Sequence, residues 1–200
     1  MVSDSKYPAS STAPTEKELK QIYAVLDKTG FASKFAQHTE RGAALSAVAM
    51  LDAALSAALQ AWMVNDEDVI QPMFHEGQPL GAFGSKIRLA YLLGMYSKVI
   101  YNDLNTVGKI RNAFAHKEDA NDFDNPQIRS WTQNLSIAAH LEKKELEMTG
   151  QVGKEIDWQG TLGPVDKTKP RWMFILSVML LTSLIKTIKS EPHSVNSPIV

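Results

Sequence analysis

The segment from Lys109 to His116, Lys-Ile-Arg-Asn-Ala-Phe-Ala-His, holds the side chains best suited to chemistry in this sequence. Arginine is a permanent cation with five hydrogen-bond donors, and histidine exchanges a proton near neutral pH. Arg111 can hold a phosphate group while His116 moves a proton, so the two are suited to phosphodiester cleavage. Asn112 follows Arg111 directly and is the third catalytic candidate.

The same residues also have a structural interpretation, which their types alone favour. A histidine in the last turn of a helix interacts well with the helix dipole and caps free carbonyl groups. An arginine on an otherwise apolar stripe is often the partner of a buried acid, and Asp52 and Glu40 are both available. Under this interpretation Arg111 pairs with one of these carboxylates, and His116 caps its own helix.

Helix geometry constrains the catalytic interpretation. Arg111 and His116 are five residues apart, so on one ideal helix their directions differ by about 140°. Asn112 and His116 are four residues apart and share a face. One copy of the segment therefore does not form a tight Arg–His pair, whereas two copies facing each other across a dimer axis would.

Signatures of other chemistries are missing from the sequence. There is no Walker loop, no GxGxxG, no HExxH and no GxSxG. The histidines lack the i, i+4 pairing of a helical metal site, and there are no cysteines, which excludes disulfides, thiolate metal sites and cysteine nucleophiles. We therefore expect no metal and no cofactor.

The charge balance does not favour direct DNA binding. The sequence has 21 Lys and Arg against 22 Asp and Glu, for a net charge of -1. A protein that holds DNA by charge normally shows a basic excess or a basic stripe, and no helix in this sequence is evidently basic on one face.

The apolar spacing predicts an all-α fold, a bundle of five to seven helices. The expected helices run from Thr15 to about Gly30, from Thr39 to about Val64, from about Gly84 to Gly94, from Ser97 to His116, from Asn125-Pro126 onward, and from Pro170 onward. Residues 65–82 are expected to be a loop because they hold two prolines and two glycines. Residues 140–169 are polar without sustained periodicity, with room for a short strand or hairpin arm.

The domain organisation is expected to be simple. Residues 1–14 are predicted to be a flexible tail, residues 15–190 one helical domain, and residues 191–200 a second tail. The most apolar stretch, residues 172–185, is shorter than the roughly twenty residues of a membrane-spanning helix, so we expect a buried core helix. With no signal peptide evident at the N-terminus, a soluble cytoplasmic protein that does not contact the membrane is expected.

The helix from Thr39 carries an acid within its apolar stripe. Its stripe consists of Leu45, Val48, Asp52, Leu55, Leu59 and Trp62. A carboxylate in such a position is costly unless a cation pairs with it. Asp52 is therefore expected to have a basic partner.

Two resemblances extend this interpretation. The run Arg-Asn-Ala-Phe-Ala-His, residues 111–116, resembles the signature of the HEPN superfamily. That resemblance implies a helical bundle that dimerises; many members are metal-independent RNases that use this Arg and His, and others are inactive binding modules.

Over residues 16–187 the chain is similar to the mannitol operon repressor (MtlR) family. The segments that carry the similarity are Glu40-Arg41-Gly42, Pro79-Leu80-Gly81 with Phe83 and Lys86-Ile87, Lys109 to His116, Phe123 with Pro126 and Ile128, and a last apolar helix entered through Arg171 and Phe174. This similarity implies an all-helical fold and negative control of transcription, without a recognised DNA-reading module.

The favoured hypothesis is a non-enzymatic, homodimeric regulator of a mannitol or sugar-alcohol operon that acts through a protein partner. Its polar cluster, with a binding or structural role, comprises Glu40, Arg41, Asp52, Lys109, Arg111, Asn112 and His116. The alternative is a HEPN-type endoribonuclease in which Arg111 and His116 of two subunits line one cleft and Asn112 orients one of them. RNA is a ligand only under that alternative.

Overall fold

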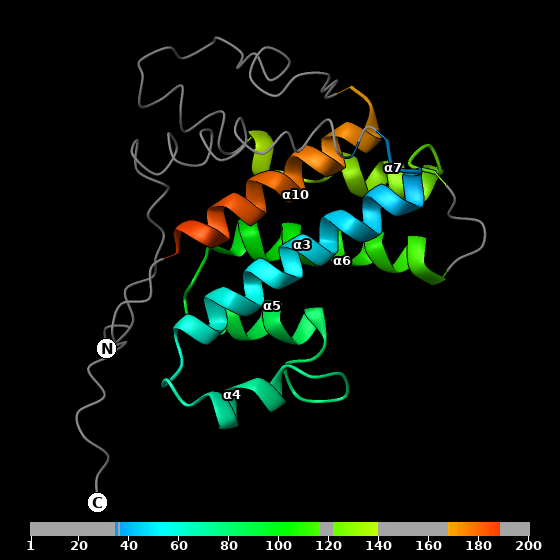
Figure 1. The fold of residues 1–200 in the computed structure, drawn as a ribbon. Coiled ribbons are helices and arrows are strands. Elements are labelled where there is room, and N and C mark those ends of the chain that lie inside the picture. The colour runs from blue at the N-terminus through cyan, green and yellow to red at the C-terminus, as the bar shows by residue number, and fades with distance from the viewer. Residues whose placement is uncertain (1–34, 36, 117–121, 140–167, 189–200) are drawn as a thin grey trace, which may run out of the picture.

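The computed structural model describes residues 35, 37–116, 122–139 and 168–188, and within them it is built from α-helices without β-strands (Figure 1). The helices are α3 (Glu40–Ala61), α4 (Glu67–Met73), α5 (Phe83–Leu92), α6 (Lys98–His116), α7 (Pro126–Gln133) and α10 (Pro170–Thr187). The predicted all-α bundle is confirmed. The predicted helix from Thr15, the polar stretch 140–167 and both predicted tails lie outside the described residues.

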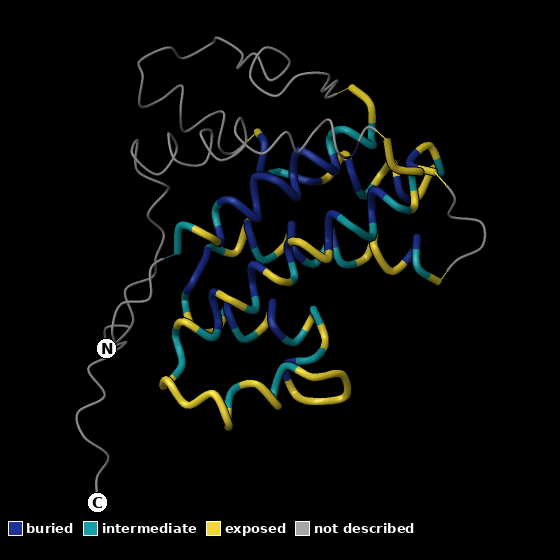
Figure 2. The backbone as a smooth tube through the Cα atoms, viewed as in Figure 1, coloured by how far each residue is buried: buried dark blue, intermediate teal, exposed yellow. Residues whose placement is uncertain are grey.

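Helices α3 and α10 run side by side through the centre of the fold (Figure 1) and form its most extensive helix–helix packing. The face of α3 toward the core is rich in alanine, including Ala43, Ala44 and Ala47, which lets α10 approach closely. Helix α10 is buried continuously from Phe174 to Ser183 (Figure 2), as expected for a helix that is apolar all round.

By length and composition alone, α3 is long and apolar enough to cross a membrane. Half of its apolar window is buried, however, and α3 packs against α10, α6 and α5. Its apolar character is therefore that of a core helix.

The helix boundaries follow from local capping chemistry. The Thr39 hydroxyl accepts a hydrogen bond from the Gly42 amide at 3.1 Å and starts α3. The Asn125 side chain accepts from the Gln127 amide at 3.0 Å, and Pro126 occupies the first turn of α7, as predicted. Helix α5 ends at Leu92, and Gly94 follows its C-cap with a φ of 74°, a conformation that glycine adopts without strain.

Three phenylalanine rings join the end of α6 to the rest of the core. The rings of Phe114 and Phe123 are 4.8 Å apart between centroids, and those of Phe123 and Phe174 are 5.2 Å apart. All three side chains are fully buried. They tie α6, the segment before α7, and α10 together, so the end of α6 is held on its apolar side.

One sequence prediction is wrong in detail. The predicted loop 65–82 contains α4, which starts where the Asp66 carboxylate accepts from the Val69 amide at 3.3 Å. No apolar periodicity marks α4 in the sequence, because none of its residues is buried. Leu92, the last residue of α5, is 79% exposed.

Candidate functional site at the start of α3 and the end of α6

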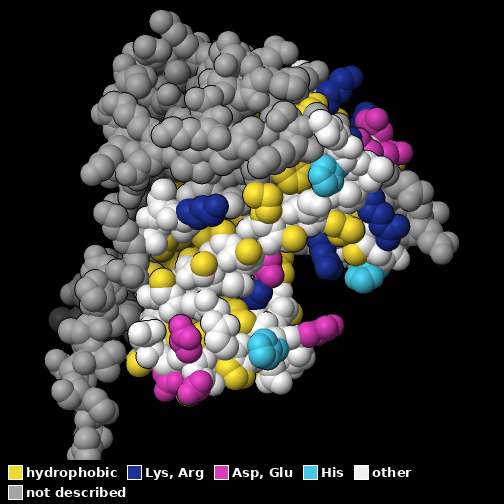
Figure 3. All heavy atoms as spheres, in the orientation of Figure 1, with side chains coloured by type: hydrophobic (Ala, Val, Ile, Leu, Met, Phe, Trp, Pro, Cys, Tyr) yellow, Lys and Arg dark blue, Asp and Glu magenta, His cyan; other side chains and the backbone are white. Residues whose placement is uncertain are grey.

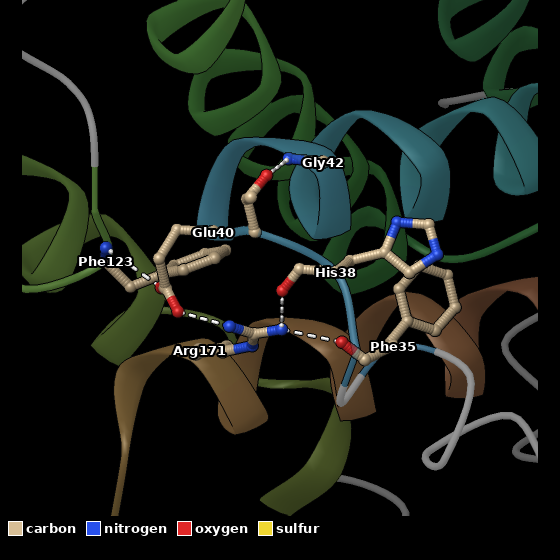
Figure 4. A network of polar contacts seen from close by, with 7 residues as sticks. Phe35, His38, Glu40, Gly42, Phe123 and Arg171 are labelled. Atoms are coloured by element: carbon tan, nitrogen blue, oxygen red, sulfur yellow. Dashed lines mark hydrogen bonds and ion pairs between the residues drawn. The ribbon is translucent and has the colours of Figure 1, made fainter.

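Arg171, in the first turn of α10, organises the start of α3 (Figure 4). Its guanidinium forms an ion pair with Glu40, and its Nη2 donates to the carbonyl oxygens of Phe35 and His38, each at 2.6 Å. The other Glu40 oxygen accepts from the Phe123 amide at 3.4 Å. One arginine–glutamate pair therefore fixes the positions of α10, α3 and the segment that enters α7.

Arg41 extends in a different direction from its neighbour Glu40. Its Nη2 donates to the Ala115 carbonyl at 2.8 Å, in the last turn of α6. The last carbonyls of a helix have no partner within the helix, and its C-terminal end favours a positive charge. Arg41 thus caps α6 and adds a positive charge at the helix end that also carries Arg111 and His116.

Arg111, Asn112 and His116 are all exposed at this end of α6. Nη1 of Arg111 donates to Oδ1 of Asn112 at 3.0 Å. The expected pairing of Arg111 with Asp52 or Glu40 is wrong, because Arg171 occupies Glu40 and Lys86 occupies Asp52. Although Arg111 lies on the apolar side of an ideal helix, it is near the helix end, and its long side chain reaches solvent.

The Asp52 partner is Lys86 of α5, with Nζ 2.8 and 2.9 Å from the two carboxylate oxygens. The Lys86 side chain is only 5% exposed, whereas the Asp52 side chain is 34% exposed. The prediction that Asp52 needs a cation is confirmed. The sequence alone does not single out Lys86 as the partner, because lysine side chains are usually exposed and a buried one is not expected.

The predicted polar cluster therefore divides into separate places. Glu40, Arg41 and the segment from Arg111 to His116 meet where α3 begins and α6 ends, and Figure 3 shows Lys or Arg side chains and a histidine on the surface there. Lys109 is exposed farther back on α6. Asp52 lies about 18 Å along α3 from Glu40 and belongs to the α3–α5 contact instead.

Sequence reasoning missed Asp103, a carboxylate on α6 that is 2% exposed. It accepts hydrogen bonds from the Ser136 amide and hydroxyl at 3.0 to 3.1 Å and from the Ile137 amide at 2.6 Å. It thereby fixes the chain where it leaves α7. The available signal was its position beside Leu104 and Val107 on the apolar face of its helix.

Chemically, this end of α6 offers exposed hydrogen-bond donors and positive charge. Within the described ranges no group of three or more His, Asp and Glu side chains is placed to hold a metal ion. Arg41, Arg111 and Asn112 can bind an anion or an acidic surface, and His116 is accessible for proton exchange.

A family model described as mannitol repressor matches residues 34–188 of this sequence. The chain belongs to the mannitol repressor family. The match includes Glu40, Arg41 and the Arg111–His116 segment, and it extends over every described helix. Comparison with curated proteins gave no match.

Two solved structures are similar to this member of the mannitol repressor family. One is the MtlR–HPr complex from Escherichia coli, with a TM-score of 0.54 and 18% identity over 86% of this chain and 99% of that chain. The other is YggD from Shigella flexneri 2a, described as a possible transcriptional regulator, with a TM-score of 0.51 and 15% identity over 90% of this chain and all of that chain. At these identities the likeness shows the shared helical fold.

Proposed function

We propose that this protein is a cytoplasmic regulator that lowers transcription of a mannitol or other sugar-alcohol operon by binding another protein. The observation that carries the proposal is the family match over residues 34–188, which includes the whole described bundle. The near-balanced charge of the sequence supports action through a partner, because a protein held on DNA by charge needs a basic excess. The proposed assembly is a homodimer.

HPr is the partner to test first. The similar E. coli protein was solved as a complex with HPr, and we propose that the HPr of this protein's own organism binds here. The described surface also offers apolar side chains for a protein contact, since Leu92, Leu93 and Val99 are 79%, 39% and 36% exposed within eight residues of the chain. Apolar side chains at the centre of an interface commonly supply most of its affinity.

The decisive experiment is deletion of the gene followed by measurement of carbohydrate-operon transcripts. We expect a rise in the transcripts of a mannitol or sugar-alcohol operon, which returns to the original level when the gene is restored. Unchanged transcripts from every such operon would contradict the proposal. Calorimetric titration with HPr tests the partner separately, with Leu92→Glu expected to weaken binding and Arg88→Glu, at another exposed position of α5, as the control.

An endoribonuclease of the HEPN type is the second candidate. It is supported by the accessibility of Arg111, Asn112 and His116 at one helix end and by the hydrogen bond that joins the first two. In this mechanism Arg111 stabilises the phosphorane charge while His116 of the facing subunit transfers a proton. The test is RNA cleavage in EDTA by the original protein and by His116→Ala. Activity that disappears in the variant supports cleavage, and equal or absent activity in both excludes it.

A further inference from the structure

Exposed apolar side chains gather at two places on the described surface. Single exposed apolar residues are ordinary, whereas a group of them marks a surface that contacts another molecule. Six large apolar side chains are exposed in the described part of the chain, and five of them fall into two groups. The acidic patch, from the end of α3 to the first turn of α4, consists of Val64, Asp66, Glu67, Asp68 and Val69. The leucine patch, from the end of α5 to the start of α6, consists of Leu92, Leu93, Lys98 and Val99.

The two patches lie in stretches of opposite charge. Between Arg41 and Lys86 the sequence contains no lysine or arginine, so the acids of the first patch have no cation near them along the chain. Between Glu76 and Asp103 it contains no acid, and Asp103 itself is buried. Figure 3 shows Asp and Glu side chains beside apolar ones over α4. Each patch therefore has apolar side chains with charges of one sign around them, and the two signs are complementary.

The core does not account for the position of α4. None of its residues is buried, and α4 is not among the described helices that pack extensively on one another. Val64 and Val69 are 66% and 60% exposed. A helix of seven residues is marginal by itself in water, because most helical stability comes from packing of an apolar face. A contact outside the described bundle would supply that packing.

The leucine patch contains a cation in a defined position. Lys98 Nζ lies 5.0 and 4.1 Å from the ring centroids of Tyr91 and Tyr101, which orients the ammonium but leaves it its charge. Leu92 has the largest exposed fraction of the exposed apolar side chains. Because the charged group is already oriented, less side-chain entropy is lost when a partner binds there.

Both patches lie on one side of the fold. Helices α3 and α5 pack against each other, and both end at the left of Figure 1. The acidic patch follows the end of α3, and the leucine patch follows the end of α5. A two-fold axis on that side brings each patch of one copy to the other patch of a second copy. Two equal contacts then close a dimer.

We propose that a second copy of this chain covers both patches, with the acidic patch of each copy docked on the leucine patch of the other. Val69 and Leu92 form the apolar centre of each contact, and Lys98 pairs with the acids of α4. This inference rests on the proposed homodimer and gives it an interface. Because α6 has 19 residues and is about 28 Å long, an interface at its start does not include the Arg111–His116 segment at its end. The second copy also covers the surface proposed for HPr, so the two compete for it.

The test is analytical ultracentrifugation of the full chain and of two variants, Val69→Lys in the acidic patch and Leu92→Glu in the leucine patch. The original protein is expected to form a dimer at micromolar concentration. Each variant carries its change in both contacts, so a loss of about tenfold per contact raises the dissociation constant about a hundredfold. An equimolar mixture of the two variants should dimerise about tenfold more tightly than either alone. The mixed dimer keeps one unaltered contact, and the introduced charges, opposite in sign, meet in the other.

The matched control is Met50→Lys, at the exposed apolar side chain that lies on α3 outside both patches. It should leave the dimer unchanged, and thermal melting checks that every variant folds. A monomeric original protein, a patch variant that dimerises as the original does, or a mixture without regained association would overturn the proposal. The measurement contains no HPr, so failure of HPr to bind would contradict the proposed partner and not the dimer. Where HPr binds, Val69→Lys should bind it more tightly than the original protein, because that variant frees the leucine patch.

Discussion

The guanidinium of Arg41 donates a hydrogen bond to the carbonyl of Ala115 across 74 residues of sequence, at 2.8 Å. Through this contact the first turn of α3 caps the last turn of α6. Since Glu40 is held in turn by Arg171, the adjacent pair Glu40 and Arg41 connects α10 to the end of α6. The position of the exposed Arg111–His116 segment therefore depends on Arg41 and, through Glu40, on Arg171.

Arg41→Ala is expected to loosen the end of α6 without unfolding the protein. The variant loses one exposed hydrogen bond and a favourable charge near the helix C-terminus, worth about 1 kcal/mol. Urea unfolding measures the loss, and hydrogen exchange should accelerate at residues 113–116. Arg88→Ala, at an exposed position of α5, should change neither quantity. Unchanged exchange in Arg41→Ala would show that the capping contact does not hold the helix end.

The Asp52–Lys86 pair is expected to respond asymmetrically to substitution. Asp52→Ala leaves the buried Lys86 ammonium without its carboxylate and should destabilise the fold by about 3 to 5 kcal/mol. Lys86→Ala should cost less, because the Asp52 side chain is a third exposed and water can solvate it. Urea unfolding of both variants and of the double variant measures the difference. If Lys86→Ala costs more than Asp52→Ala, the burial difference does not control this pair.

Arg111→Ala is expected to leave the stability of the fold nearly unchanged. Arg111 is exposed and its hydrogen bond goes to the neighbouring Asn112, so its removal strands no buried carboxylate. Surface substitutions of this kind usually change the free energy of unfolding by less than about 0.5 kcal/mol. A loss of several kcal/mol on urea unfolding would indicate that Arg111 has a buried acidic partner after all.

Much of the fold was predictable from local signals. Asn125 with Pro126, and Pro170, marked helix starts that the structure confirms, because capping and proline preferences act within a few residues. The identity of charged partners was not predictable. Lys86 and Arg171 reach Asp52 and Glu40 from positions 34 and 131 residues away, which only tertiary packing determines.

The candidate site shows the same division between local and long-range signals. The exposed trio Arg111, Asn112 and His116 was found from residue type and spacing. Arg41 belonged to the predicted polar cluster. Its acceptor is the backbone carbonyl of Ala115, however, and every residue has such a carbonyl, so the residue type does not reveal the contact. The capping contact therefore emerged only from the structure.

Tyr96 is expected to make stability depend on alkaline pH. Its hydroxyl is buried and donates to the Ile87 carbonyl at 2.7 Å. Burial, with a smaller contribution from the Tyr101 phenol, raises the pKa of Tyr96 well above its ordinary value. The unfolded chain therefore loses this proton first, and stability falls as the pH rises above about 10.

Tyr96→Phe separates this effect from other alkaline titrations. At neutral pH the variant should lose about 1 kcal/mol with its hydrogen bond to Ile87. Above about pH 10 its free energy of unfolding should decline less steeply than that of the original protein. Urea unfolding across this range measures both slopes. Parallel slopes would contradict a titration of Tyr96 coupled to folding.

Arg171→Lys is expected to destabilise the fold although it keeps the positive charge. Arg171 binds Glu40 and two carbonyl oxygens through a planar fork of donors, and the compact lysine ammonium reaches fewer of these acceptors. Since the two side chains are only 19% and 31% exposed and three acceptors lose their donor geometry, we expect a loss of about 2 kcal/mol on urea unfolding.

The control is Arg129→Lys in the Arg129–Asp124 ion pair, whose side chains are 50% and 73% exposed. Exposed pairs contribute little, so this change should stay within about 0.5 kcal/mol. Because Arg171 holds the start of α3, Arg171→Lys should also speed hydrogen exchange at the amides of Gly42 and Phe123, which the Thr39 cap and Glu40 protect. Equal stability losses in the two variants would show that the charge of Arg171, and not its fork of donors, holds these segments together.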